Sequence, residues 1–240
     1  MTRAAWDGVM ADGRLYRDRT HAGERLAARL DAYRDTGALV LGIPRGGVPV
    51  AVEVARLLEA DLDVVVARKL RAPGYPELAI GAVTANGGQF LNDDIIRELA
   101  VSHDYLAQEI AVQMADARRR EERFRGGRAP RDLIDRVVIV VDDGLATGAT
   151  MHAAVRSVRT GQPARLVVAV PVGSAQACED LRKEADELIC LLAPEDFWAV
   201  GAYYVHFEPV EDDEVTRILH AAHREAAVDT VGLDERRLRD

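Results

Sequence analysis

Residues 137–150 read VVIVVDDGLATGAT, and this stretch decides the fold that the sequence predicts. The five β-branched residues from Val137 to Val141 are typical of a strand that is buried on both faces in a parallel sheet. Asp142 and Asp143 follow where such a strand should end, and a small, hydroxyl-bearing turn then leads into a helical pattern over residues 151–160. The stretch therefore predicts a strand, a tight turn and the N-terminus of a helix.

The predicted turn has the chemistry of an anion site. Backbone N–H groups point outward at a helix N-terminus and the helix dipole adds partial positive charge, while Thr147 and Thr150 add hydroxyl donors. The carboxylates of Asp142 and Asp143 cannot serve the same anion, so their natural partners are hydroxyl groups or a divalent cation beside it. A ligand with a phosphate at one end and a diol next to it, such as a phosphorylated ribose, meets both requirements.

The stretch resembles the phosphoribosyl diphosphate (PRPP) motif of type I phosphoribosyltransferases, and most closely a bacterial group of predicted phosphoribosyltransferases. That motif consists of a hydrophobic strand, an acidic pair, variable positions and a small-Thr-Gly-x-Thr loop, all present here without a gap. The resemblance implies that Asp142 and Asp143 are catalytic, hold the ribose hydroxyls and bind Mg²⁺ mainly through substrate and water. It also implies a set of PRPP-binding residues: Gly46, Gly47, Gly144, Leu145, Ala146, Thr147, Gly148, Ala149 and Thr150.

Composition limits the classes of protein that this chain can represent. Its 240 residues suffice for one large α/β domain, 48% of them are hydrophobic, and the net charge of −9 argues against general nucleic-acid binding. No run approaches the ~18 apolar residues of a membrane span, and residues 1–13 lack the apolar core of a secretory signal. Cys178 and Cys190 match no metal or redox spacing. We therefore expect a cytoplasmic protein with no nucleic-acid or membrane partner.

A second glycine turn follows a predicted strand over residues 38–44 and precedes another predicted helix. The turn reads Arg45-Gly46-Gly47, in which the glycines let the main chain approach a ligand and Arg45 brings a permanent forked cation suited to phosphate. In type I phosphoribosyltransferases the loop after the first core strand binds pyrophosphate, and this turn is similar to it. The resemblance implies a catalytic role for Arg45 and a cis peptide bond between Arg45 and Gly46.

Residues 62–69 read as a further strand that ends in Arg68-Lys69, as in the Arg-Lys-rich segment of adenine phosphoribosyltransferases. Residues 70–78 contain two prolines and a glycine and are predicted to be a loop. In the family this region is a mobile flap that closes over the reaction centre, so Lys69 and Arg71 are expected to be catalytic or else to be solvated loop cations. Glu77 is a further candidate for contacting the base.

The rest of the chain alternates between predicted strands and helices, with a hairpin over residues 80–91 and a helical insertion over 92–125. This pattern predicts an α/β fold, with a mainly parallel sheet and helices on both faces. The resemblance implies that this is the type I phosphoribosyltransferase fold plus a small hood. We expect one domain over residues 14–227, hood elements at 194–210, and flexible tails at 1–13 and 228–240. In the hood, Phe197 and Trp198 either stack on the base or form core or dimer contacts.

The implied reaction moves the phosphoribosyl group of PRPP to a small nitrogenous base in nucleotide salvage, with Mg²⁺ as cofactor and a homodimer as the expected assembly. Enzymes for 6-oxopurines place an acidic residue just before the Thr-Gly of the loop, where this chain has Ala146. The acceptor base therefore stays open. Two alternatives also stay open: a regulator that senses PRPP without turning it over, and an enzyme acting on another phosphorylated sugar.

Overall fold

The predicted parallel sheet is present in the computed structural model, which describes residues 15–237, with side chains up to Arg224. The strands pair in parallel in the order β2-β1-β6-β7-β8, so that β6, which carries the acidic pair at its end, lies at the centre. All residues of β1 and most of those of β6 and β7 are buried. The strands are β1 (Leu39–Gly42), β2 (Asp61–Val64), β6 (Val137–Val141), β7 (Arg165–Val172) and β8 (Glu187–Leu192).

Helices cover both faces of this sheet, as predicted. On one face Val40 and Ile139 pack in a core with residues of α1, α2, α4 and α7. On the other face Val138 and Val140 pack with residues of α5 and α6. The alternation of neighbouring residues between the two cores follows from the two-residue period of a strand. The sheet-covering helices are α1 (Arg19–Arg29), α2 (Gly47–Leu58), α5 (Ala149–Thr160), α6 (Ala175–Leu181) and α7 (Asp212–Arg237), and a short 3-10 helix, η1 (Asp31–Tyr33), follows α1.

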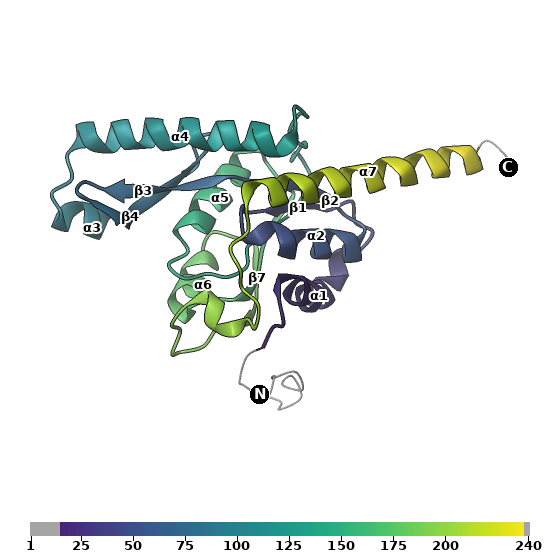
Figure 1. Ribbon diagram of the computed structural model, residues 1–240, viewed down its shortest axis with the longest axis horizontal. Coiled ribbons are helices and arrows are strands. Elements are labelled where there is room, and N and C mark those ends of the chain that lie inside the picture. Colours follow the sequence, from purple (N-terminus) through teal and green to yellow (C-terminus); the bar gives the residue numbers. More distant parts are fainter. Residues whose placement is uncertain (1–14, 238–240) are drawn as a thin grey trace.

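A second, antiparallel sheet projects from the first and corrects two predictions (Figure 1). The strand predicted over residues 62–69 is in fact two strands, because β2 ends at Val64 and β3 (Ala67–Ala72) belongs to the second sheet. The loop predicted over residues 70–78 is wrong as well, since β3 and β4 (Tyr75–Thr84) form a hairpin. The third strand is β5 (Gln89–Leu91), which confirms the predicted hairpin over residues 80–91.

The physical reason for the second error lies in where the turn residues fall. Gly74 has a φ of +76° and lies with Pro73 in the turn between β3 and β4. Pro76 lies in the part of β4 where the register with β3 is irregular, so its missing N–H costs no regular ladder hydrogen bond. Leu70 and Ala72 are buried beneath α4, so this segment is held by apolar packing that a loop would lack.

The predicted helical insertion over residues 92–125 is present as two helices that pack on the second sheet. They are α3 (Asp93–Glu98), capped by the Asn92 side chain, and α4 (His103–Arg125), capped by the Ser102 side chain. Ala100 has a φ of +47° between them, which interrupts the helix. Gly126 ends α4 in the left-handed region.

The C-terminal part of the chain lies against the edge of the main sheet. It includes a short 3-10 helix, η2 (Val200–Tyr203), and then Tyr204, whose hydroxyl donates to the Asp143 carbonyl at 2.7 Å. Helix α7 continues to Arg237, so it includes residues 228–237, which were predicted to belong to the C-terminal tail. The predicted tail over residues 1–13 lies outside the described residues, and the division into one domain, hood and tails stays a prediction.

Within residues 15–237 no helix combines the length and apolar character needed to cross a membrane.

Candidate phosphoribosyl site

The two glycine turns predicted from the sequence meet at the carboxyl ends of β1 and β6, which are neighbours in the sheet. A Cβ atom added to Gly46 would lie 2.0 Å from Asp143 Oδ2, and one added to Gly47 would lie 2.8 Å from the Cα atom of Asp142. Any larger residue at either position would therefore collide with the acidic pair. The Arg45-Gly46-Gly47 turn and the Asp142-Asp143 pair thus form one site, as expected for the carboxyl edge of a parallel sheet.

The acidic pair is held in a largely enclosed environment. Burial and the charge of Asp143 raise the pKa of Asp142 well above its usual range, and burial also raises the pKa of Asp143 against the opposing effect of Arg19. The backbone N–H of Asp143 donates to Asp142 Oδ1 at 2.8 Å. Because two like charges are close together and only one has a cationic partner, the pair favours hydroxyl donors or a further cation.

Arg19 is a residue of this site that the sequence analysis missed. Its Nε atom donates to Asp143 Oδ2 at 2.8 Å, and its Nη1 atom donates to the Glu208 carbonyl at 2.9 Å. Its guanidinium lies 3.9 Å from the centre of the Phe207 ring. These contacts join residues that are 124 or more positions apart, so no local pattern in the sequence could have indicated them.

The donor set of the site fits one kind of metal better than others. The described residues contain no group of three or more His, Cys, Asp or Glu side chains that could hold an ion alone. A pair of carboxylates instead fits Mg²⁺, which keeps several waters and binds through one or two carboxylates plus substrate phosphates. Asp142 and Asp143 are the residues that would hold it.

The loop between β6 and α5 has the geometry of a phosphate cradle. Leu145 is buried and anchors the loop, because its N–H donates to the Val172 carbonyl and its carbonyl accepts from the Ser174 N–H, both at 2.9 Å. Gly148 has a φ of +75° and caps the N-terminus of α5, while Ala146 and Thr147 are exposed. An exposed loop that leads into a helix N-terminus is suited to an anion.

Arg45 is the first residue of the glycine turn, and its side chain points toward the start of α7. Its Nη1 atom lies 3.2 Å from Glu211 Oε2 and 3.9 Å from Asp212 Oδ1. The predicted cis bond between Arg45 and Gly46 is wrong, because the cis peptide bond joins Pro44 and Arg45, one position earlier. The sequence carries no local signal for a cis bond before a residue other than proline, so its position had been predicted from the resemblance to the family alone.

The predicted flap residues are not joined to the acidic pair by any hydrogen bond or ion pair among the described residues. Lys69 and Arg71 are exposed on β3, and Glu77 is exposed on β4. The backbone of Arg71 is held by α4, since its N–H donates to Glu109 Oε1 and its carbonyl accepts from the Tyr105 hydroxyl, both at 3.1 Å. Their catalytic and base-contacting roles stay predictions.

The hood lies directly over the acidic turn. A Cβ atom added to Gly144 would lie 2.6 Å from Val200 Cγ1, which places η2 against this turn. Phe197 is half-buried and stacks on Tyr203 with 5.8 Å between ring centres, whereas the Trp198 side chain is 90% exposed. Phe197 therefore packs within the hood, and the ring of Trp198 is available to a ligand or to another chain.

Comparison with known protein families gives a match over most of the chain. Residues 15–208 match the model of the family described as Phosphoribosyl transferase domain. This chain belongs to that family. The resemblance on which the sequence analysis relied is therefore confirmed at the level of family and fold, while the role of each site residue stays a prediction.

Relatives of known source show how far the similarity extends. Over 214 residues the chain is 44% identical to "Putative phosphoribosyl transferase Rv0571c" of Mycobacterium tuberculosis strain H37Rv, and equally to "Putative phosphoribosyl transferase MT0597" of strain CDC 1551. The match covers 89% of this chain and 48% of each relative, so the chain spans about half their length. The crystal structure of TT1426 from Thermus thermophilus is 48% identical with a TM-score of 0.72, covering 85% of this chain and 97% of that one.

Proposed function

We propose that this protein transfers the phosphoribosyl group of PRPP to a nitrogen atom of a small base and releases pyrophosphate. The observation that carries the proposal is the contact between the two turns. They are so close that a Cβ atom on either glycine of one turn would collide with the acidic pair of the other. A diphosphate-binding turn, a hydroxyl-binding acidic pair and a phosphate cradle thus adjoin one another, in the order of the groups in PRPP.

Each part of the site matches one part of this substrate. The cradle at Ala146–Thr150 would take the 5-phosphate through backbone N–H groups and the dipole of α5. The carboxylates of Asp142 and Asp143 would accept hydrogen bonds from the ribose hydroxyls. Arg45 and the backbone of Gly46 and Gly47 would contact the diphosphate.

The chemistry follows from where charge develops. When the bond from the anomeric carbon to the diphosphate breaks ahead of bond formation to the base, the ribose becomes positive and the leaving group gains negative charge. Arg45 and the Gly46–Gly47 backbone would stabilise the leaving group electrostatically. The carboxylates of the acidic pair would lie near the positive ribose. A bound Mg²⁺ would add positive charge beside the diphosphate.

The remaining residues would position the base and exclude water. The exposed indole of Trp198 offers a flat surface for stacking next to the hood, which packs on Gly144. The hairpin of β3 and β4 carries Lys69 and Arg71 and would close over the site, shielding the positive ribose from water. Helix α4 already holds the backbone of Arg71, so such a closure would involve mainly the turn around Gly74.

The test is an assay of pyrophosphate release from PRPP with Mg²⁺ and a panel of purine and pyrimidine bases. We expect turnover with at least one base and its loss in the Asp142→Asn/Asp143→Asn protein. Asp135→Asn is the matched control, because Asp135 is exposed and its φ of +55° is one that Asn tolerates. PRPP binding without release for every base would refute catalysis and favour the sensing protein. Absence of PRPP binding would refute both.

A further inference from the structure

A small pocket lies beside the proposed diphosphate turn, on the side of β1 that faces β2 rather than β6. It has a volume of about 170 Å³ and opens between the β1 turn, the start of β3 and helix α4. A cavity of about 10–15 Å³ already holds one water molecule, so this pocket has room for a phosphoryl group. Its lining consists of Pro44, Arg45, Val66, Ala67, Arg68, Arg120 and Phe124.

All charged side chains in this lining are arginines. Arg45 comes from the diphosphate turn, Arg68 from β3, and Arg120 from α4. The Nε atoms of Arg68 and Arg120 lie 2.8 Å and 3.2 Å from the same oxygen, Asp116 Oδ2, so the two guanidinium groups are close together. Burial and the positive charge of Arg120 lower the pKa of Arg68. Three guanidinium groups that line one small pocket suit a phosphate, because each offers N–H donors in a planar fork that matches phosphate oxygens.

The acidic residues that balance these arginines lie outside the pocket wall. Asp116 pairs with Arg68 at 2.8 Å and with Arg120 at 3.2 Å, and it also pairs with Arg119 at 3.0 Å. One carboxylate is therefore shared by three guanidinium groups, so an anion that enters the pocket would compete with Asp116 for Arg68 and Arg120.

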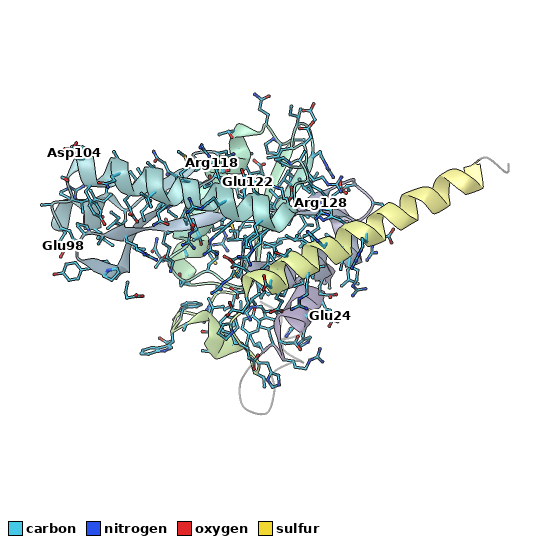
Figure 2. All side chains as sticks on the ribbon, turned by 45° about the horizontal axis from the view of Figure 1, so that its top comes forward. Glu24, Glu98, Asp104, Arg118, Glu122 and Arg128 are labelled. Carbon is cyan, nitrogen blue, oxygen red and sulfur yellow. The ribbon has the colours of Figure 1, made fainter. Side chains whose placement is uncertain are left out.

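The first turn of α7 supplies the other carboxylates. Asp212 accepts from Arg120 Nη1 at 3.1 and 3.2 Å and from Arg123 at 3.2 Å, and Arg123 also pairs with Asp213 at 2.7 Å. Glu211 pairs with Arg45. Figure 2 shows α4 running past the start of α7, with Arg118 and Glu122 marking the stretch of α4 that contains Arg120. Arg120 is therefore paired with Asp116 on its own helix and with Asp212 at the start of α7.

We propose that this pocket receives the terminal phosphate of the diphosphate arm and that Arg120 is the residue of α4 that holds it. The inference rests on the proposed function for the identity of the anion, since Arg45 belongs to both the diphosphate turn and the pocket. It gives helix α4, which lies outside the parallel sheet, a direct part in binding the leaving group.

The test is calorimetric titration of the full chain with magnesium pyrophosphate and, separately, with ribose 5-phosphate. We expect Arg120→Gln to weaken pyrophosphate binding about tenfold to a hundredfold, as for the loss of a charge-assisted hydrogen bond. Its affinity for ribose 5-phosphate should stay unchanged, because the cradle after β6 lies on the other side of β1. Arg119→Gln is the matched control, since Arg119 shares Asp116 but does not line the pocket.

A second variant separates direct contact from loosened packing. Asp212→Asn also breaks the link between α4 and α7, but it removes a carboxylate that competes with the ligand for Arg120. We expect this variant to bind pyrophosphate as tightly as the natural protein or more tightly. A tenfold loss in Asp212→Asn, or unchanged affinity in Arg120→Gln, would overturn the proposal.

The outcomes also separate the pocket from the proposed function. If pyrophosphate binds in a way that depends on Arg120 while no base supports turnover, the pocket stands and the transferase proposal fails. If PRPP is turned over but the affinity for pyrophosphate is unchanged in Arg120→Gln, the transferase proposal stands and the proposed role of the pocket is refuted. Absence of pyrophosphate binding by the natural protein would overturn the pocket outright.

Discussion

Replacing Gly46 by Ala gives a sharp test of how the two turns depend on each other. Gly46 has φ −63° and ψ −31°, which Ala adopts without strain, so only the added methyl group matters. That methyl would lie 2.0 Å from Asp143 Oδ2, far inside any contact distance. Asp143 would have to move, and its Oδ2 atom would leave Arg19 Nε, which it accepts from at 2.8 Å.

The expected cost follows from this geometry. Overpacking of a well-packed site costs about 1–3 kcal/mol, and we expect Gly46→Ala to lower the free energy of unfolding by that amount. The carboxylate also leaves the position proposed for the ribose hydroxyls, so kcat/KM for PRPP should fall about a hundredfold, the equivalent of about 2.7 kcal/mol. Urea unfolding and steady-state kinetics measure the two effects separately.

A double-mutant cycle identifies the cause. In an Asp143→Ala background the obstructing carboxylate is absent, so Gly46→Ala should cost less than about 0.5 kcal/mol and the two changes should be strongly non-additive. The double variant should recover stability relative to the sum of the single changes, yet remain inactive. Additive losses of stability would refute the reasoning, because they would mean that Gly46 and Asp143 do not compete for the same space.

Three further predictions concern the acidic pair, the hood and the hairpin. The folded pKa of Asp142 is raised, so its contribution to stability is present below the unfolded pKa of about 3.9 and is lost as pH rises through the folded pKa. Asp142→Asn should therefore raise the free energy of unfolding more at pH 7.5 than at pH 4, and equal increases at the two pH values would refute this. Trp198→Ala should change stability by less than about 0.5 kcal/mol and raise KM for the base about threefold to tenfold with KM for PRPP unchanged; unchanged KM for both would exclude stacking. Arg71→Ala should lower kcat more than it weakens PRPP binding, and hydrogen exchange should slow at residues 73–78 on binding Mg·PRPP; equal exchange with and without ligand would leave the turn as an ordinary surface feature.

The sequence alone was sufficient wherever the determining interactions are local. The run of β-branched residues before Asp142 predicts a central buried strand, and the small residues that follow predict a turn and a helix start, because strand and helix periods are visible within a few residues. The glycines of the β1 turn were likewise recognisable as places of close approach. The structure then supplied what they approach, namely the carboxylates of Asp142 and Asp143.

The tertiary structure alone decided the features that depend on partners far apart in the chain. Gly74 and the prolines on either side of it indicated a loop, but burial of Leu70 and Ala72 beneath α4 makes the segment a hairpin. Arg19 and Arg120 look like ordinary charged residues in the sequence. Their contacts are with Asp143, 124 positions away, and with Asp212, 92 positions away, and the roles proposed for them rest on those contacts. A guanidinium becomes part of a site through the carboxylates and ligands it faces, and that arrangement exists only once the distant segments have packed together.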